Sequence, residues 1–189
     1  MQRALVIIKE EHRALAAVMH GLAYLMAEIG QNRVQPDFRL LRAMLDYVEG
    51  FPDRLHHPKE DAYLFRALRR RAPQAAEMLD RLEAEHRQGP EDTATLQRLL
   101  DGFEQNADGF AAFAAAVNEC VDSTFRHMAA EEGKVLPLAM QVLTAEDWVE
   151  INEAFAANND PMIGMEAQRE FRDLFSRILA LAPAPIGFG

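Results

Sequence analysis

The sequence predicts an all-α protein: an up-down four-helix bundle followed by two additional short C-terminal helices. Apolar residues recur every three or four positions along most of the chain, which is the period of amphipathic helices. Four histidines fall once each on the first four helical segments, and no alternating pattern typical of strands occurs. The 189 residues, of which 49% are hydrophobic, are enough to bury one sizeable core.

The first two helices follow from this period and from the loop signals between them. The first covers about residues 3–28, and the segment Gly30 to Pro36 ends it. The second begins after the proline that closes this loop, because helices tolerate proline in their first turn. Pro52 and Pro58 lie inside the second helix and each removes an intrahelical hydrogen bond, so we expect a kink around His56.

The later elements are predicted in the same way. The third helix covers about residues 73–103 and is expected to be disturbed at Gly89-Pro90, and the fourth covers residues 110–138. Thr144 is a helix-capping residue that begins the first of the two short helices. The predicted parts are the bundle at residues 1–142, two helices packed on it at 143–182, from 145–157 and 165–181, and a tail at 183–189.

Charge and cysteine content exclude several classes of function. Thirty acidic against twenty basic residues give a net charge of -10, which disfavours binding to nucleic acid or to an anionic membrane. The basic run from Arg69 to Arg71 is expected at a helix C-terminus, where the helix dipole favours cations. Cys120 is the one cysteine and is expected to be a buried thiol. No apolar run approaches the roughly 20 residues of a membrane span, and no signal-peptide core is present, so we expect a cytoplasmic protein.

The spacing of four histidines places them at one level of the bundle. These histidines are His12, His56, His86 and His127. Residues at the same height on adjacent antiparallel helices lie equally far along the chain from the turn that joins them. The midpoints between successive histidines are Val34, Arg71 and the Asn106-Ala107 pair. Each midpoint lies in or beside a turn signal, so the four imidazoles are expected to share one layer.

Two of these histidines are followed four residues later by a glutamate, and this pattern is typical of a metal site. His56 precedes Glu60 and His127 precedes Glu131, so each pair lies on one face of its helix, whereas Glu132 turns outward. Four imidazoles and two carboxylates suit two ions, and nitrogen and oxygen donors without thiolate suit iron, manganese or zinc. Without a cation, burying these groups would leave several charges unpaired. The predicted metal ligands are His12, His56, Glu60, His86, His127 and Glu131.

The register of the second helix leaves one alternative open. His57 and Asp61 are also four residues apart, but they lie about 100° and 140° around the helix from His56, whereas Glu60 lies about 40° from it. His56 and Glu60 are therefore the preferred ligands, and His57 is an alternative ligand or a supporting residue if the proline kink rotates the register. Tyr63 lies one turn beyond Glu60, where it is either a core tyrosine or a hydrogen-bond donor to a ligand of the metal.

These residues resemble the haemerythrin HHE cation-binding family in its bacterial, four-histidine form. The matching segments are His12, His56 to Phe65, Glu85-His86 and His127 to Glu132. The resemblance implies a haemerythrin-like bundle with a non-haem di-iron centre, two iron ions per chain, that binds oxygen or nitric oxide. The oxygen carriers of the family have a second histidine one turn from the third, but here Leu82 and Pro90 occupy those positions. The chain is also similar to the four-histidine di-iron repair proteins and to iron- and oxygen-sensing HHE domains.

Three functions are consistent with this reading. The preferred one is a small-molecule binding protein, a sensor or store for oxygen, nitric oxide or iron, because the inward face is apolar and shows no polar set for recognising a larger substrate. The second is a di-iron enzyme that acts as an oxidase, reduces peroxide or nitric oxide, or repairs iron-sulphur clusters. The third is a structural bundle that a metal merely clamps. The sequence does not set the oligomeric state.

Overall fold

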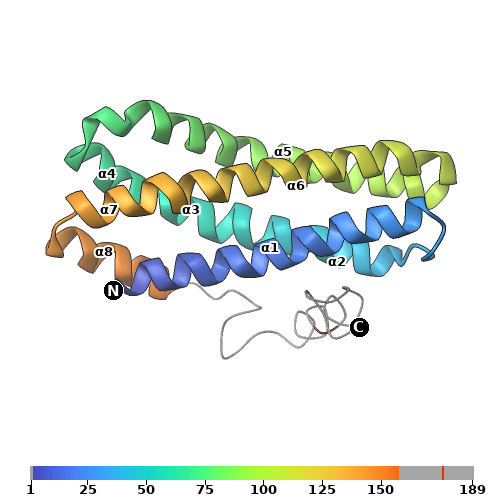
Figure 1. Cartoon of the computed structure of the whole chain (residues 1–189), viewed down its shortest axis with the longest axis horizontal. Helices are drawn as coiled ribbons and strands as arrows, with labels where there is room; N and C mark the ends of the chain where they lie inside the picture. The colour runs from blue at the N-terminus through green and yellow to red at the C-terminus, as the bar shows by residue number, and fades with distance from the viewer. Residues whose placement is uncertain (1, 158–175, 177–189) are drawn as a thin grey trace.

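The structure, a computed structural model, describes residues 2–157 and residue 176. Within this part of the chain all regular structure is helical, and the helices form four antiparallel rods (Figure 1). The rods are α1 (Arg3–Gly30); α2 (Phe38–Val48), η1 (Glu49–His56), α3 (His57–Lys59), η2 (Glu60–Phe65) and α4 (Arg66–Arg71); α5 (Ala76–Gln105) after η3 (Pro73–Ala75); and α6 (Phe110–Ala130), η5 (Glu131–Val135) and α7 (Leu136–Val142) after η4 (Ala107–Gly109). This confirms the predicted all-α, up-down four-helix bundle.

One further described helix, α8 (Ala145–Ala156), follows the bundle and corresponds to the first of the two predicted C-terminal helices. Its apolar side chains Trp148, Ile151 and Phe155 are buried in the same cluster as Ala4 of α1. The backbone N–H of Ala4 also donates to the side chain of Asn152 at 2.8 Å. The second predicted helix, residues 165–181, lies outside the described residues apart from residue 176.

Two apolar clusters occupy the two ends of the bundle. The cluster towards the α1–α2 turn includes Met19, Leu45, Leu100 and Phe113, and the other includes Ile8, Leu68, Leu82 and Val135 (all buried). On the first three rods the two sets of apolar residues are separated by a stretch that carries a predicted histidine, and on the fourth rod the break between Met128 and Val135 carries Glu131. The bundle therefore consists of two dry blocks with a polar layer between them.

The second rod departs from regular α-helix where the sequence predicts a kink. It contains two π-helical segments, η1 with Pro52 inside it and η2, on either side of the short α3 that holds Pro58. A proline cannot supply its backbone N–H to the helical ladder, and a wider turn accommodates the extra residue. The wider turns rotate the following side chains away from the register of a straight α-helix, which brings both His56 and His57 to the interior.

The predicted interruption at Gly89-Pro90 is wrong, because α5 continues through both residues. Pro90 removes one backbone hydrogen bond, but α5 is anchored on both sides of it by buried side chains. These are Leu79, Leu82 and His86 before it and Thr93, Leu96, Leu100 and Phe103 after it. Packing of an amphipathic face decides helix continuity here more strongly than the loss of a single bond.

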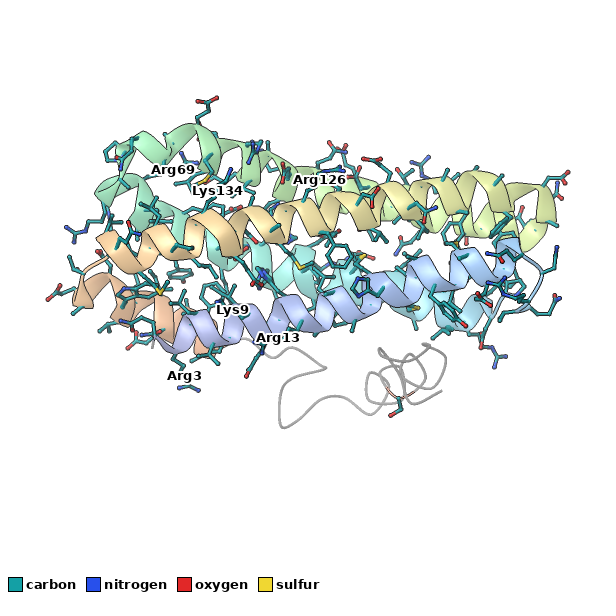
Figure 2. The ribbon with its side chains drawn as sticks, viewed as in Figure 1. Arg3, Lys9, Arg13, Arg69, Arg126 and Lys134 are labelled. Atoms are coloured by element: carbon teal, nitrogen blue, oxygen red, sulfur yellow. The ribbon has the colours of Figure 1, made fainter. Side chains whose placement is uncertain are left out.

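The surface is charged but its basic groups are dispersed and largely ion-paired. Figure 2 shows Arg3, Lys9 and Arg13 along α1 and Arg126 on α6, well separated from Arg69 on α4. The run that begins at Arg69 binds acidic neighbours: Arg69 contacts Asp80 at 2.6 Å and Arg71 contacts Asp147 at 2.7 Å. No helix among residues 2–157 combines the length and the hydropathy that a membrane crossing requires.

Asp147 fastens the start of α8 to the end of α4. It completes a capping box with Thr144 and accepts a hydrogen bond from Arg71 at 2.7 Å. This hydrogen bond, with those from Thr144, lowers the pKa of Asp147 to about 2. Because the pKa is depressed in the folded state, the stabilisation is present above the ordinary pKa of an aspartate and is lost as the pH falls towards 2.

We predict that Asp147→Ala lowers the free energy of unfolding by about 1–2 kcal/mol at neutral pH, since it removes a cap and a charged hydrogen bond. Glu150→Ala is the matched control on the same helix, because Glu150 pairs with Arg66 in solvent and such pairs contribute about 0.5 kcal/mol. Urea unfolding followed by circular dichroism measures both. Equal losses in the two variants would show that Asp147 does not fasten α8.

Candidate metal centre

The six predicted ligands meet in the polar layer between the two apolar clusters. His12 comes from α1, His56 and Glu60 from the second rod, His86 from α5, and His127 and Glu131 from the fourth rod. All six are buried, and the two glutamates are 0% and 1% exposed. The midpoint argument therefore predicted the height of these residues correctly, although their role as ligands stays a prediction.

The two glutamates lie between two pairs of histidines. Glu131 has one carboxylate oxygen 3.3 Å from His12 Nε2 and the other 3.3 Å from His127 Nε2. Glu60 Oε2 lies 3.4 Å from His56 Nε2 and 3.7 Å from His86 Nε2. Each carboxylate thus faces one imidazole on each side of the layer, and this is the arrangement that two bridged metal ions require.

The potential donor atoms form two overlapping groups. His12, His56 and Glu60 make one group, and Glu60, His86, His127 and Glu131 make the other, with the ligand atoms of each group within 4.8 Å of one another. His56 Nε2 and all four carboxylate oxygens of Glu60 and Glu131 are buried and make no hydrogen bond of normal geometry to a described residue. Buried polar atoms left in this state are costly. A cation among these nitrogen and oxygen donors removes the cost, so the residues present fit a metal centre.

Four acidic residues on neighbouring rods bind the outer nitrogens of the four histidines. His56, His86 and His127 each place Nδ1 2.7 Å from a carboxylate oxygen, of Glu11, Asp61 and Glu85 respectively, and His12 Nδ1 lies 3.0 Å from Glu132. In a neutral imidazole, an Nδ1–H that donates to a carboxylate leaves Nε2 without a proton and directed at the centre of the layer. The same contact raises the basicity of the imidazole as a metal ligand.

These supporting carboxylates were not predicted from the sequence. Glu132 is exposed, as predicted, and its carboxylate nevertheless reaches His12. The available signal was adjacency: Glu11, Asp61, Glu85 and Glu132 each stand directly beside a predicted ligand in the chain. Their side chains reach across to the histidine of the next rod and not to their own neighbour, so helix geometry within one rod does not reveal them. Metal-binding histidines usually donate their outer N–H to an acidic partner, and a search for such partners among the adjacent residues would have identified these four.

The pKa values of the two buried glutamates are shifted in opposite directions in the absence of a cation. Burial, reinforced by the nearby charge of Glu131, raises the pKa of Glu60 well above its ordinary value. Burial also acts to raise the pKa of Glu131, but the imidazoles of His12, His127 and His86, which face its oxygens at 3.3 to 3.7 Å, outweigh it and hold this pKa well below the ordinary value. Burial opposes the charge on His86, yet Asp61 and Glu131 prevail and raise its pKa to about 9. The metal-free layer therefore carries protons that a metal must displace.

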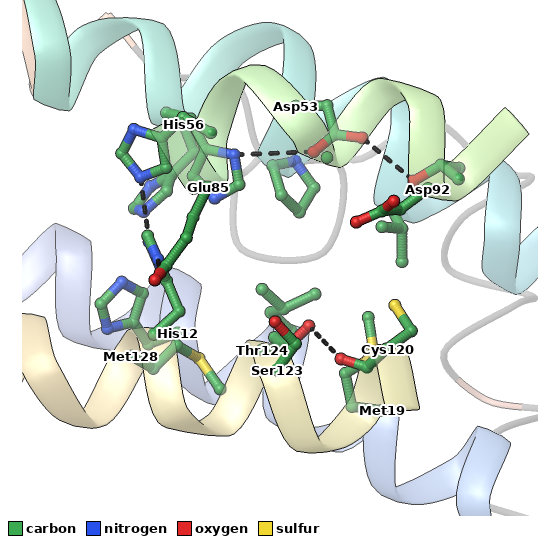
Figure 3. A pocket seen from close by; sticks show the side chains of 18 residues that line it. His12, Met19, Asp53, His56, Glu85, Asp92, Cys120, Ser123, Thr124 and Met128 are labelled. Atoms are coloured by element: carbon green, nitrogen blue, oxygen red, sulfur yellow. Dashed lines mark hydrogen bonds and ion pairs between the residues drawn. The ribbon is translucent and has the colours of Figure 1, made fainter. Parts of the chain in front are cut away.

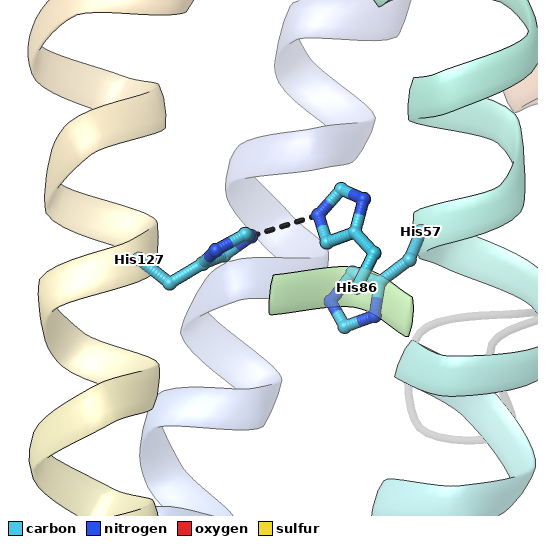
Figure 4. A group of neighbouring side chains, drawn as sticks. All are labelled: His57, His86 and His127. Atoms are coloured by element: carbon cyan, nitrogen blue, oxygen red, sulfur yellow. Dashed lines mark hydrogen bonds between the residues drawn. The ribbon is translucent and has the colours of Figure 1, made fainter. Parts of the chain in front are cut away.

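His57 also enters the layer, which the straight-helix register did not predict. Its ring stacks on that of His86 with centroids 4.2 Å apart, and its ligand atom lies within 4.8 Å of those of His86 and His127 (Figure 4). Tyr63 does not take part. Its side chain packs against the apolar cluster at the α8 end, and the guanidinium of Arg66 lies over its ring. Tyr63 lies within the wide turn of η2, which rotates it away from Glu60.

A cavity of about 90 Å³ adjoins the layer on the side away from α8 (Figure 3). His12, His56, His57, His86 and His127 form one end of it. The rest of the lining is mostly apolar, but it includes Asp53, which lies 3.6 Å from His57, and the hydroxyl groups of Thr93 and Thr124. Thr93 donates to Asp53 at 3.1 Å, and Thr124 donates to the backbone carbonyl of Cys120 at 2.9 Å. Burial raises the pKa of the Cys120 thiol to about 11, so it stays protonated at neutral pH.

Comparison with known families agrees with the geometry of the layer. The model of the hemerythrin HHE cation binding domain matches residues 3–139. The chain belongs to this family. The match ends within α7, so it covers the four rods of the HHE domain, and α8 lies beyond it. No curated protein and no solved structure gives a significant match to the chain.

We predict that metal uptake by the HHE domain releases protons and strengthens as the pH rises from about 6 to about 8. The pKa values of Glu60 and His12 are raised and that of His86 is raised to about 9, so these groups hold their protons to a higher pH in the metal-free protein than they would in solvent. Ligands must be deprotonated, so a higher pH favours binding. Titration of the metal-free protein with Fe²⁺ or Co²⁺ in weak buffer with a pH indicator measures the release. An affinity that is independent of pH would contradict this protonation scheme.

Proposed function

We propose that this protein holds two iron ions in the histidine–glutamate layer and binds oxygen or nitric oxide beside them, in a sensing, storage or stress-response role. The observation that supports this proposal is the pair of buried carboxylates, Glu60 and Glu131, whose oxygens lack hydrogen bonds and face imidazole nitrogens on both sides. Iron is preferred over manganese or zinc because nitrogen and oxygen donors suit it and because the chain belongs to the HHE family.

The residues of the layer would have different roles at the metal centre. His12 and His56 would serve one ion, His86 and His127 the other, and Glu60 and Glu131 would bridge them. Iron, when bound, supplies redox chemistry and open positions for a diatomic molecule. The acidic partners of the histidines fix the direction of each Nε2, and the apolar clusters on both sides exclude bulk water.

The size of the cavity supports a diatomic ligand over a larger substrate. Its volume of about 90 Å³ is smaller than the engineered cavities of about 150 Å³ that accept benzene. A molecule of oxygen or nitric oxide fits such a space beside the layer. An organic substrate of ordinary metabolite size would require the packed side chains around it to move.

A second candidate, an enzyme that reduces peroxide or nitric oxide, is favoured by one observation. The cavity wall also carries Asp53, 3.6 Å from His57, and Thr93, which donates to Asp53, and polar side chains of this kind can take part in proton transfer to a molecule in the cavity. The two candidates differ in turnover. A binding protein gives a reversible spectral change, whereas an enzyme consumes an electron donor over many cycles.

The decisive experiment is elemental analysis of anaerobically purified protein, followed by absorption spectra before and after oxygen or nitric oxide is admitted. Two irons per chain with a charge-transfer band that appears and reverses support the proposal. A band that decays as product accumulates supports the enzyme. Stoichiometric zinc, or equal stability with any divalent ion and no spectral response to gas, would overturn both in favour of a structural clamp.

We predict that Glu60→Ala and Glu131→Ala each lower the metal content from two ions per chain to one or none, since each carboxylate faces both sides of the layer. Glu119→Ala on α6 is the control, because Glu119 is exposed and pairs only with a surface arginine in the described contacts. Elemental analysis and circular dichroism of the three variants separate metal loss from unfolding. Full occupancy in either layer variant would refute the bridging role.

A further inference from the structure

We propose that His57 is a fifth histidine ligand, which joins His86 and His127 on one of the two metal ions. The inference rests on the two-metal centre proposed above and assigns its two ions unequal donor sets: three histidines on the side of His86 and two, His12 and His56, on the other. The second rod carries two adjacent histidines, His56 and His57, whereas the third rod carries His86 alone. The positions one turn from His86 on α5 are Leu82 and Pro90, whereas His57 of the second rod stacks on His86.

The positions of the three rings allow them to share an ion. The ligand atoms of His57, His86 and His127 all lie within 4.8 Å of one another. His86 Nε2 and His127 Nε2 approach to 2.9 Å, and the rings of His57 and His86 are nearly parallel, at an interplanar angle of 9°. Nitrogens bound to one metal at about 2.1 Å lie roughly 3–4 Å apart, so these spacings need only small side-chain adjustments.

His57 also has the acidic partner that marks the other four histidines. Asp53 Oδ1 lies 3.6 Å from His57 Nδ1, on the outer side of the ring. The distance is longer than the 2.7 to 3.0 Å of the other four pairs, and His57 Nδ1 is buried without a hydrogen bond of normal length. A small movement of the imidazole therefore completes the Asp53 contact and leaves Nε2 as the nitrogen assigned to the metal.

Asp53 is itself held in place by α5. Thr93 donates to its other oxygen at 3.1 Å, and its side chain is only 4% exposed. A Cβ atom at Gly89 would lie 2.7 Å from Asp53 Oδ1, so α5 carries a glycine where the carboxylate passes. Glycine in a helix interior is unfavourable by roughly 0.5–1 kcal/mol relative to alanine. The close approach of the Asp53 carboxylate explains why glycine occupies position 89.

The first test counts the histidine ligands directly. In the Co²⁺-loaded full-length protein, each ligated imidazole contributes one exchangeable, hyperfine-shifted N–H proton signal. We expect five such signals in the natural protein and four in His57→Ala, together with a loss of more than about tenfold in affinity for one of the two ions. His20→Ala is the control, because His20 is exposed and stacks on Phe125 away from the layer.

The outcomes separate this inference from the proposed function. Two bound ions with four signals in the natural protein, or five signals that persist in His57→Ala, would overturn the assignment of His57 and leave the two-metal centre intact. Failure to bind two ions at all would overturn the proposed function itself. The count in the natural protein decides the question even if His57→Ala does not fold.

The second test displaces Asp53 without touching an imidazole. Gly89→Ala should shift or broaden the N–H signal of His57 and leave the other four in place, because the new methyl group meets Asp53. Gly102→Ala is a matched control in the same helix, since nothing lies within 4 Å of a Cβ atom there. Identical spectra for the two variants would show that Asp53 does not position His57.

Discussion

The burial of two carboxylates, Glu60 and Glu131, at the centre of a helical bundle is the constraint on which the rest of this structure depends. Both are almost fully removed from solvent, and their oxygens find no hydrogen-bond donor of normal geometry in the described part of the chain. Removing one partner from a buried charged group typically costs about 3–5 kcal/mol, which is a large share of the stability of a single domain. The surrounding imidazoles relieve part of this cost, and a bound cation would relieve the remainder. The proposed metal centre would therefore complete the core at this level.

The supporting carboxylates give the layer a closed organisation that joins all four rods. Glu11 of the first rod binds His56 of the second, Asp61 of the second binds His86 of the third, Glu85 of the third binds His127 of the fourth, and Glu132 of the fourth binds His12 of the first. Each rod thus gives an acidic group to one neighbour and receives one from the other. The two apolar clusters hold the rods together above and below this ring of contacts. A cavity of about 90 Å³ adjoins the imidazoles on the side of the cluster that includes Met19.

Much of this arrangement could be predicted from the chain alone, and the failures have definite causes. The midpoint rule placed the four histidines correctly because antiparallel rods with short turns keep equal heights on either side of each turn. The register of a straight α-helix did not predict that His57 enters the layer, because the second rod widens into η1 before this residue. Tyr63 packs against an apolar cluster, which was one of its two predicted roles. The acidic partners depend on contacts between rods, which residue spacing within one rod does not show. The continuity of α5 through Pro90 results from packing on both sides, which outweighs the local signal of Gly89-Pro90.

The central claim, that two metal ions complete the layer between Glu60 and Glu131, is tested most directly by a crystal structure of the iron-loaded protein with anomalous diffraction data at the iron edge. The account predicts two anomalous peaks inside the layer, both within bonding distance of Glu60 and Glu131. One peak should adjoin His12 and His56 and the other His86 and His127. A single peak at the surface, or a layer in which protonated Glu60 donates a hydrogen bond to Glu131 with no metal present, would contradict the claim.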